Sequence, residues 1–237
     1  MRNIALILMY NGTAYHGWQV QKTETTVAQT LERGLSMVCG QPIKCTGCGR
    51  TDAGVHAIAQ YVSLPVSEAE LALPGSRLMR SLCALTPDDL SVQALYRAPA
   101  GFSARFDALS RSYRYRIAAS QARPVLAWDH SWWYRGELDA SAMARAARPL
   151  LGEHDFKSFC KATSAEGKPT CRYVGALDVT RIAEAGEELV VIDITGNAFL
   201  HNMVRTIAGS LVEVGRGHRP EGWLADVLEA RDRAAAG

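Results

Sequence analysis

Hydrophobic and polar positions along the chain follow two patterns, one typical of strands and one typical of helices. Short apolar runs bounded by Gly, Pro or Asn predict strands, and apolar residues that recur every three or four positions predict helices. In the first part of the chain, strands are expected at 3–10, 43–48, 57–64 and 90–96, and helices at 27–39 and 74–85. Thr26 is a candidate N-cap, Gly40 a helix end, and Pro65 the end of a strand.

The second part of the chain repeats this alternation of strands and helices. We expect a strand at 111–117, a helix at 140–151, a hairpin of 172–182 with 189–195, helices at 200–214 and 221–230, and a frayed end at 231–237. The pattern predicts an α+β fold in two halves, residues 1–104 and 105–237.

Composition narrows the class of protein. The chain has 237 residues, 48% of them hydrophobic and 21% charged, as in a soluble globular protein. Its only N-terminal apolar run, residues 4–9, is short and lacks a cleavage pattern, and no stretch reaches membrane-spanning length. We therefore expect a cytoplasmic protein without membrane contact. A formal charge of +2 does not identify a polyanionic partner by itself.

The cysteines and glycines give no sign of a metal or a cofactor. Six cysteines without a secretory signal are expected to be free thiols. Only Cys45 and Cys48 have metal-like spacing, and no second pair completes a four-ligand zinc site. There is no GxGxxG fingerprint. We expect neither a metal nor a cofactor.

A glycine-punctuated stretch, residues 47–57, contains the candidate catalytic acid. Asp52 lies in this loop, between the strands expected at 43–48 and 57–64, and Arg50 lies two positions earlier. An ionised carboxylate in a loop can act as a nucleophile, a base or an electrostatic stabiliser. Arg50 can hold that carboxylate or contact a phosphate. The alternative is an Asx-turn, in which Asp52 only hydrogen-bonds nearby backbone.

A basic and aromatic segment follows the boundary between the halves. It carries the arginines Arg105, Arg111, Arg114, Arg116 and Arg123. In a strand over 111–117, Tyr113 and Tyr115 share one face, and Arg114 and Arg116 share the other. Such a ribbon suits RNA, since arginines contact phosphates and a tyrosine stacks on an unpaired base. The alternative is an edge strand with a solvated charged face. Lys161 is a further candidate RNA contact.

Arg205 stands out in the helix expected at 200–214. Apolar residues cover most of this helix, so we expect Arg205 to be buried and to need an acid partner. Asp52 is the functional candidate, and Asp193 or Glu213 would be a purely structural partner.

Several motifs resemble one family. The stretch Gly49-Arg50-Thr51-Asp52-Ala53-Gly54-Val55-His56-Ala57 is similar to the signature of the TruA family of tRNA pseudouridine synthases. Further blocks resemble the family in the same order along nearly the whole chain. They are Tyr10–Thr13 with Gly17–Gln19, Phe102–Phe106, Arg114–Arg116, Leu151–Phe156 and His201–Arg205.

The resemblance implies an activity and a fold. Asp52 would be the catalytic aspartate, Tyr115 the base-stacking tyrosine, and Arg205 an active-site arginine. The substrate would be tRNA, at uridines 38 to 40 of the anticodon arm, and the protein would be a homodimer. The two halves would share a continuous, mostly antiparallel sheet with a central cleft. The chain ends at Gly237 without the glycine-leucine segment that forms the family's last strand.

Two other functions compete with this one. A noncatalytic RNA-binding protein would share the basic and aromatic ribbon, but it has no need of an acid in a glycine loop. A glycosidase would need a second carboxylate near Asp52, for which Asp155 is the candidate.

Overall fold

The computed structural model describes residues 2–66 and 74–237. The chain forms two compact units, Met1–Ala108 (unit 1) and Leu109–Gly237 (unit 2). Residues 102–104 belong to unit 1, because Ala104 N–H donates to Ser63 Oγ at 3.0 Å and Phe102 O accepts from Asn3 Nδ2. The boundary expected between 104 and 105 stays a prediction.

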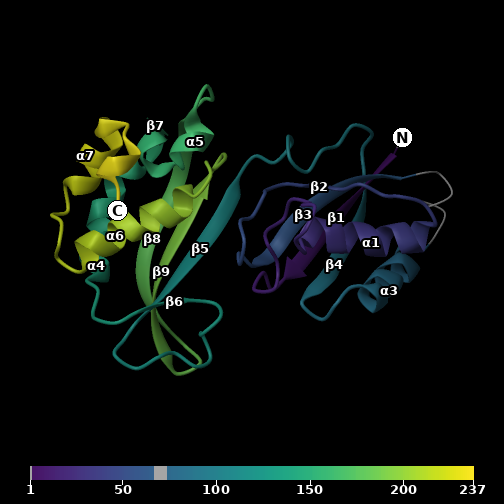
Figure 1. The fold of residues 1–237 in the computed structure, drawn as a ribbon, viewed down its shortest axis with the longest axis horizontal. Helices are drawn as coiled ribbons and strands as arrows, with labels where there is room; N and C mark the ends of the chain where they lie inside the picture. The colour runs from purple at the N-terminus through teal and green to yellow at the C-terminus, as the bar shows by residue number, and fades with distance from the viewer. Residues whose placement is uncertain (1, 67–73) are drawn as a thin grey trace. The chain divides into compact units, whose positions relative to one another are not determined.

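Unit 1 is a sheet with helices on one face (Figure 1). Its strand order is β2-β3-β1-β4, with every neighbouring pair antiparallel. The elements are β1 (Arg2–Tyr10), α1 (Val27–Cys39), β2 (Thr46–Gly47), β3 (Ala57–Val66), α3 (Gly75–Leu85) and β4 (Leu90–Ala98). Side chains of β1, β3 and β4 pack with those of α1 and α3 in one core.

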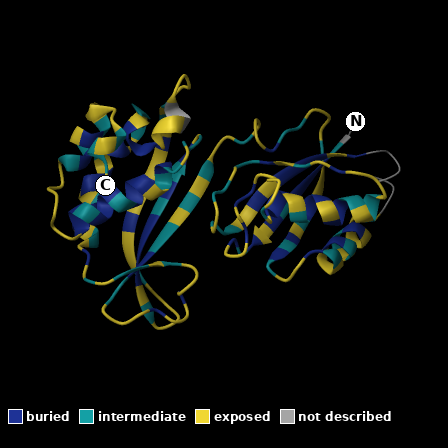
Figure 2. Cartoon of the chain, viewed as in Figure 1, coloured by how far each residue is buried: buried dark blue, intermediate teal, exposed yellow. Residues whose placement is uncertain are grey.

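Local signals explain α1 well. Thr26 Oγ1 accepts the Gln29 N–H at the start of the helix, and Gly40 ends it with φ of 66°, a conformation that glycine adopts without strain. Leu31 and Leu35 are fully buried beneath the helix. Figure 2 shows the same division into a buried and an exposed side. The predicted helix is confirmed.

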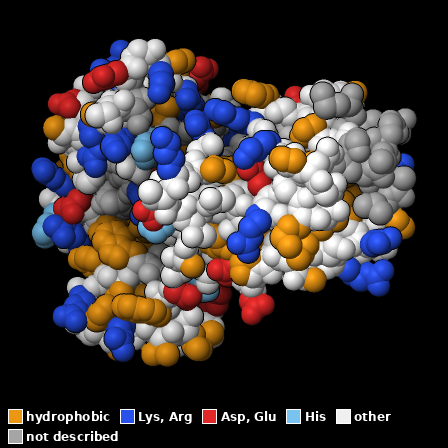
Figure 3. Space-filling model, turned by 45° about the vertical axis from the view of Figure 1, so that its right-hand side comes forward, with side chains coloured by type: hydrophobic (Ala, Val, Ile, Leu, Met, Phe, Trp, Pro, Cys, Tyr) orange, Lys and Arg blue, Asp and Glu red, His pale blue; other side chains and the backbone are white. Residues whose placement is uncertain are grey.

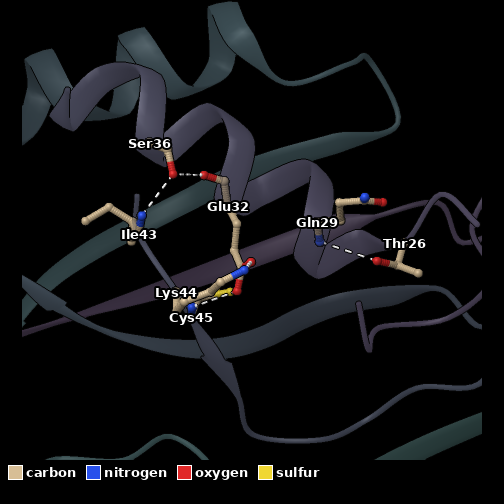
Figure 4. A network of polar contacts seen from close by, with 7 residues as sticks. All are labelled: Thr26, Gln29, Glu32, Ser36, Ile43, Lys44 and Cys45. Atoms are coloured by element: carbon tan, nitrogen blue, oxygen red, sulfur yellow. Dashed lines mark hydrogen bonds and ion pairs between the residues drawn. The ribbon is translucent and has the colours of Figure 1, made fainter. Parts of the chain in front are cut away.

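The segment before β2 is held by helix side chains instead of by a strand ladder (Figure 4). The buried Glu32 accepts the Cys45 N–H at 3.0 Å and pairs with Lys44 Nζ at 2.7 Å. Ser36 Oγ accepts the Ile43 N–H at 2.9 Å and donates to Glu32 O. The prediction of a strand over 43–48 is therefore wrong for 43–45, and the strand also ends before Cys48.

Pro65 does not end β3, contrary to prediction, because the strand continues to Val66 with Pro65 opposite Asn3. Proline is tolerated on a strand with an open edge. β2 pairs only with Ser63 and Val62, so β3 has no described neighbour on that side at Pro65.

Unit 2 is a five-stranded sheet with the order β6-β5-β9-β8-β7, and α4, α6 and α7 pack on one of its faces (Figure 1). Its strands are β5 (Arg111–Ala119), β6 (Trp132–Tyr134), β7 (Gly152–Asp155), β8 (Cys171–Glu184) and β9 (Glu187–Gly196). Its α-helices are α4 (Ala140–Ala147), α5 (Ala162–Ala165), α6 (Met203–Gly215) and α7 (Trp223–Ala230). Short 3₁₀ turns occupy Arg148–Leu150, Lys157–Phe159 and Arg233–Ala235. The predicted hairpin is confirmed, with Ala185 and Gly186 both at positive φ in its turn.

The end of the chain is packed, contrary to the prediction that 231–237 is frayed. Asp232 N–H donates to Ser158 Oγ at 2.9 Å, and Gly237 N–H donates to Ser210 Oγ at 3.1 Å. Both serines are fully buried. The polar composition of the segment hid these two long-range contacts.

The predicted α+β class is confirmed, and the strands in the described part of the chain form two sheets where the resemblance implied a continuous one. Over residues 2–66 and 74–237, no helix has the length and apolar character needed to cross a membrane. In the same ranges, no three His, Cys, Asp or Glu side chains gather as metal ligands would.

The Glu32 contacts give a testable prediction. Replacing Glu32 by Leu leaves the Cys45 N–H without its acceptor, and a buried unsatisfied group costs about 1–3 kcal/mol. We expect faster amide hydrogen exchange in α1 and around Cys45. Lys44→Gln is the matched control, because Lys44 is exposed and its replacement leaves the hydrogen bond from Cys45 N–H to Glu32 intact. Equal effects of the two variants would contradict this account.

Candidate active site

Asp52 lies in the loop that joins β2 to β3, in a turn closed by its own backbone. The Val55 N–H donates to Asp52 O at 3.2 Å, and Gly54 within the turn has φ of 77°. At the start of the loop, the buried Gln60 of β3 donates from Nε2 to Gly49 O at 2.7 Å. Asp52 itself is half-buried.

The residue before Asp52 is fixed by the chain that follows β1. Trp18 N–H donates to Thr51 O at 2.9 Å. The hydroxyl groups of Tyr10 and Thr51 lie 2.8 Å apart and share a hydrogen bond. Both the backbone and the side chain of Thr51 are therefore held.

The residues after Asp52 are fixed by the same segment. Gly54 N–H donates to Tyr15 O at 3.2 Å, and Gly12 N–H donates to His56 Nδ1 at 3.1 Å. Together with the bonds to Thr51, these contacts bracket Asp52 on both sides. We call the docked pair of segments, residues 10–18 and 47–56, the loop clamp.

The loop clamp depends on close approach of backbone to backbone. A Cβ on Gly12 would lie 2.2 Å from Val55 O, and a Cβ on Gly17 would lie 2.8 Å from Thr51 O. Gly17 also has φ of 90°, which favours glycine. The glycine of the Asn11-Gly12 dipeptide thus allows the contact between the segment after β1 and the Asp52 loop.

Two buried aromatic side chains belong to the 10–18 segment of the loop clamp. Tyr15 and Trp18 are buried, with 4% and 3% of their surface exposed. The Tyr15 hydroxyl donates to Asp89 Oδ1. Burial, and then this hydrogen bond, raise the pKa of Tyr15 well above its usual value. Tyr15 is thus a neutral donor at physiological pH.

Tyr115 and Arg205 are neighbours within unit 2. Tyr115 is on β5, where its ring meets Trp132 edge to face with centroids 6.4 Å apart. Burial raises the pKa of Tyr115, and the positive charge of Arg205 acts in the opposite direction. The tyrosine and arginine predicted from sequence therefore share one electrostatic environment.

The arginines on the cationic side of β5 face acids of the strands β9 and β8. Arg114 binds Asp193 of β9 through two hydrogen bonds, Nε to Oδ1 at 2.7 Å and a terminal guanidinium nitrogen to Oδ2 at 2.8 Å. This contact raises the pKa of Arg114. Arg116 lies 3.4 Å from Glu184. The expected alternation of tyrosine and arginine faces is present, and carboxylates offset the charge of its arginine face.

Comparisons with known proteins identify the family of the chain. Residues 146–237 match a family model described as tRNA pseudouridine synthase. A protein of Geotalea uraniireducens named tRNA pseudouridine synthase A is 40% identical over 237 residues, which is 100% of this chain and 94% of that protein. A protein of the same name from Nitrosococcus oceani is 43% identical over 236 residues, covering 99% of this chain and 87% of its own length. This chain belongs to the tRNA pseudouridine synthase family.

One expectation about Arg205 is wrong. Arg205 is exposed, because it shares its side of α6 with the exposed His201 and the half-buried Gly209 and Glu213. The residues expected to surround Arg205, Ala208 and Val212, face the core instead. The two acids considered as purely structural partners of Arg205 pair with other arginines. Asp193 binds Arg114, and Glu213 pairs with Arg216. Asp52 belongs to unit 1, so its pairing with Arg205 stays a prediction.

The other predicted RNA contacts lie on both units. Arg50 is exposed in the Asp52 loop, and Arg105 lies in the segment after β4, with its guanidinium 5.3 Å from the centre of the Phe106 ring. Arg111 donates to Asn197 O at 2.7 Å, at the end of β9. Lys161 is exposed, and its N–H donates to His201 O at 3.1 Å, close to the start of α6. Lys161 and Arg205 therefore belong to the same part of unit 2.

Asp155, the candidate second carboxylate of a glycosidase, has structural contacts in unit 2. Its Oδ1 accepts the Lys157 N–H at 3.1 Å, and its Oδ2 lies 3.7 Å from Arg231. These contacts anchor the end of β7 and favour a structural role.

Sequence reasoning assigned no role to His56 or to the backbone of Gly12. Tyr10 lies opposite Ala57 in the β1–β3 pair, which brings the residues that follow β1 next to those that precede β3. Pairing the two predicted strands would have pointed to this contact.

The loop clamp predicts a large effect of adding one methyl group. Gly12→Ala places a Cβ against Val55 O, so the two segments must separate, at a cost of about 1–3 kcal/mol. We expect a lower free energy of unfolding of unit 1 and faster hydrogen exchange at Trp18 and Gly54. Gly75→Ala is the matched control, because its Cβ would make an ordinary 3.6 Å contact with Leu95. A stable Gly12→Ala protein with slow exchange would contradict the clamp.

Proposed function

We propose that this protein isomerises uridine to pseudouridine in tRNA and that the carboxylate of Asp52 acts at the ribose C1′. Three relatives with this family name match at about the same level, among them one from Klebsiella pneumoniae at 41% identity over 98% of this chain. The observation that supports Asp52 most strongly is the loop clamp, which fixes the residues on both sides of it.

The reaction depends on stabilising the charge that develops at C1′, and it consumes no second substrate. The N1–C1′ bond breaks, the uracil turns, and a C5–C1′ bond forms, with the C5 proton going to solvent and N1 gaining one. Uridine and pseudouridine are isomers, so the reaction needs no external oxidant or reductant. A carboxylate beside C1′ can stabilise positive charge there, attack C1′ or remove a sugar proton, and Asp52 suits each of these roles.

The target uridine must leave its stack before an acid reaches its sugar. Tyr115 would stack on the uracil, and its raised pKa keeps the phenol neutral. Arg205 would orient and balance the Asp52 carboxylate, for which its exposed position leaves it accessible. By resemblance, the target uridines are at positions 38 to 40, and the protein is a cytoplasmic homodimer whose tRNA can span both subunits.

The proposed phosphate contacts are Arg50, Arg105, Arg111, Arg114, Arg116 and Lys161. In Figure 3, lysine and arginine side chains are spread over the visible face with acidic side chains among them. Phosphate must therefore compete with carboxylates for some of these cations. The ion pairs of Arg114 and Arg116 reduce the contribution expected of those two.

A noncatalytic RNA-binding protein is the alternative function. Asp52 decides between the two, because a carboxylate repels phosphate and would weaken simple RNA binding.

The Asp52 proposal is tested by release of tritium from tRNA that carries it at uridine C5. Asp52→Asn should lower the single-turnover rate by about 10⁴-fold or more, since the charged group is lost while the fold is kept. Binding of tRNA, measured by filter retention, should persist. Asp88→Asn, an exposed acid elsewhere in unit 1, is the control and should release tritium normally. Normal release by Asp52→Asn would exclude this role. Binding without any release by the wild-type chain would instead favour the noncatalytic alternative.

The ion pairs predict which arginines contribute to the salt dependence of tRNA binding. Each phosphate contact contributes about −0.7 to −0.9 to the slope of log K against log salt. Arg50→Gln should remove one such contribution, because Arg50 is exposed. Arg114→Gln should change the slope less, since Asp193 already neutralises this guanidinium. The measurement is the binding constant for tRNA from 50 to 200 mM salt in both variants. A larger change of slope in Arg114→Gln than in Arg50→Gln would contradict this account.

A further inference from the structure

His56 takes part in the loop clamp with a ring nitrogen that must be unprotonated. Gly12 N–H donates to His56 Nδ1 at 3.1 Å. A backbone N–H can only donate, so Nδ1 must offer its lone pair, and the proton of the neutral imidazole then lies on Nε2. The assignment follows from the donor alone.

The contact is one link in a chain of bonds that leads to Asp52. Gly12 O accepts the Tyr15 N–H at 2.9 Å, and Tyr15 O accepts the Gly54 N–H at 3.2 Å. The next residue, Val55, donates to Asp52 O. His56 therefore fixes a glycine whose carbonyl and neighbours fix the turn of Asp52. If Nδ1 were protonated, its N–H would point at the Gly12 N–H, so two donors would face each other. The Gly12 N–H would then have lost its acceptor.

We propose that neutral His56 is a positioning residue that holds the Asp52 loop in its active geometry, and that protonation of His56 releases the loop. The proposal rests on the proposed function of Asp52. It adds a residue that acts through Gly12 and does not touch the substrate. Activity should then depend on pH through a group outside the chemistry itself.

Other titratable groups lie on the segments around His56. They are Tyr10, Tyr15 and His16 on the 10–18 segment, Cys48, Arg50 and Asp52 on its own loop, and Asp89 before β4. Tyr15 is bonded to Asp89, and His16 Nδ1 lies 3.3 Å from Glu24. A comparison of variants that differ only at position 56 separates His56 from all of these groups.

The test uses His56→Asn and His56→Ala in the full chain. The Asn Oδ1 can replace Nδ1 as an acceptor and does not titrate, whereas Ala has no acceptor. Wild-type single-turnover tritium release should fall as the pH is lowered through the imidazole range, about pH 8 to 5. His56→Asn should keep most of the neutral-pH rate and lose this decline. His56→Ala should be slower at every pH by about 10²-fold, as expected for a displaced catalytic group, with unchanged tRNA binding.

Two outcomes would overturn the proposal. One is a wild-type rate in His56→Ala, and the other is the same acid decline in His56→Asn as in the wild type. A third readout does not need activity: ¹⁵N spectra of the ring at neutral pH should show the proton on Nε2, and a proton on Nδ1 would overturn the inference. Failure of the proposed function would look different, since the wild-type chain would then release no tritium at any pH.

Discussion

The antiparallel pairing of β1 with β3 is the constraint on which the candidate site depends. Tyr10 at the end of β1 lies opposite Ala57 at the start of β3. The segment that leaves β1 and the loop that enters β3 must therefore emerge side by side at the same end of these two strands. Backbone hydrogen bonds between them, together with the bond from Gly12 N–H to His56 Nδ1, then fix the turn of Asp52. A slip of this register by one residue would separate Gly12 from His56 and turn the side chains of β1 to the wrong faces.

The other end of the Asp52 loop is anchored through α1. Glu32 and Ser36 hold residues 43–45, so β2 needs only its short pairing with β3 to direct the chain into the loop. The rings of Tyr15 and Trp18 are buried in the core of unit 1. The Trp18 ring approaches Gly47 so closely that a larger residue at position 47 would clash with it. A loop anchored in this way loses little further conformational entropy when substrate binds, which favours precise presentation of one carboxylate.

The sequence predicted most of the fold wherever the signal was local. The α1 caps and apolar stripe and the β8–β9 hairpin depend on residues close together in the chain, and both predictions are confirmed. The errors share a different cause. The short β2, the strand through Pro65 and the packed end at Gly237 are decided by partners far away in sequence. For the site, the motif pointed to Asp52, but the loop clamp needed the strand pairing. The error at Arg205 came from counting apolar residues around a helix without knowing which side met the sheet.

The candidate site residues of the two units are held by different kinds of contact, and this difference affects the RNA contacts proposed for each unit. In unit 1 the hydrogen bonds of the loop clamp join uncharged groups, mostly backbone donors and acceptors and the hydroxyls of Tyr10 and Thr51. In unit 2, Arg114 and Asp193 lie directly opposite each other on β5 and β9 and form a bidentate pair. A carboxylate in that geometry occupies the same donors that a phosphate would use. A phosphate must therefore displace Asp193 to reach Arg114, so the contribution proposed for this arginine in RNA binding is reduced by the cost of breaking that pair.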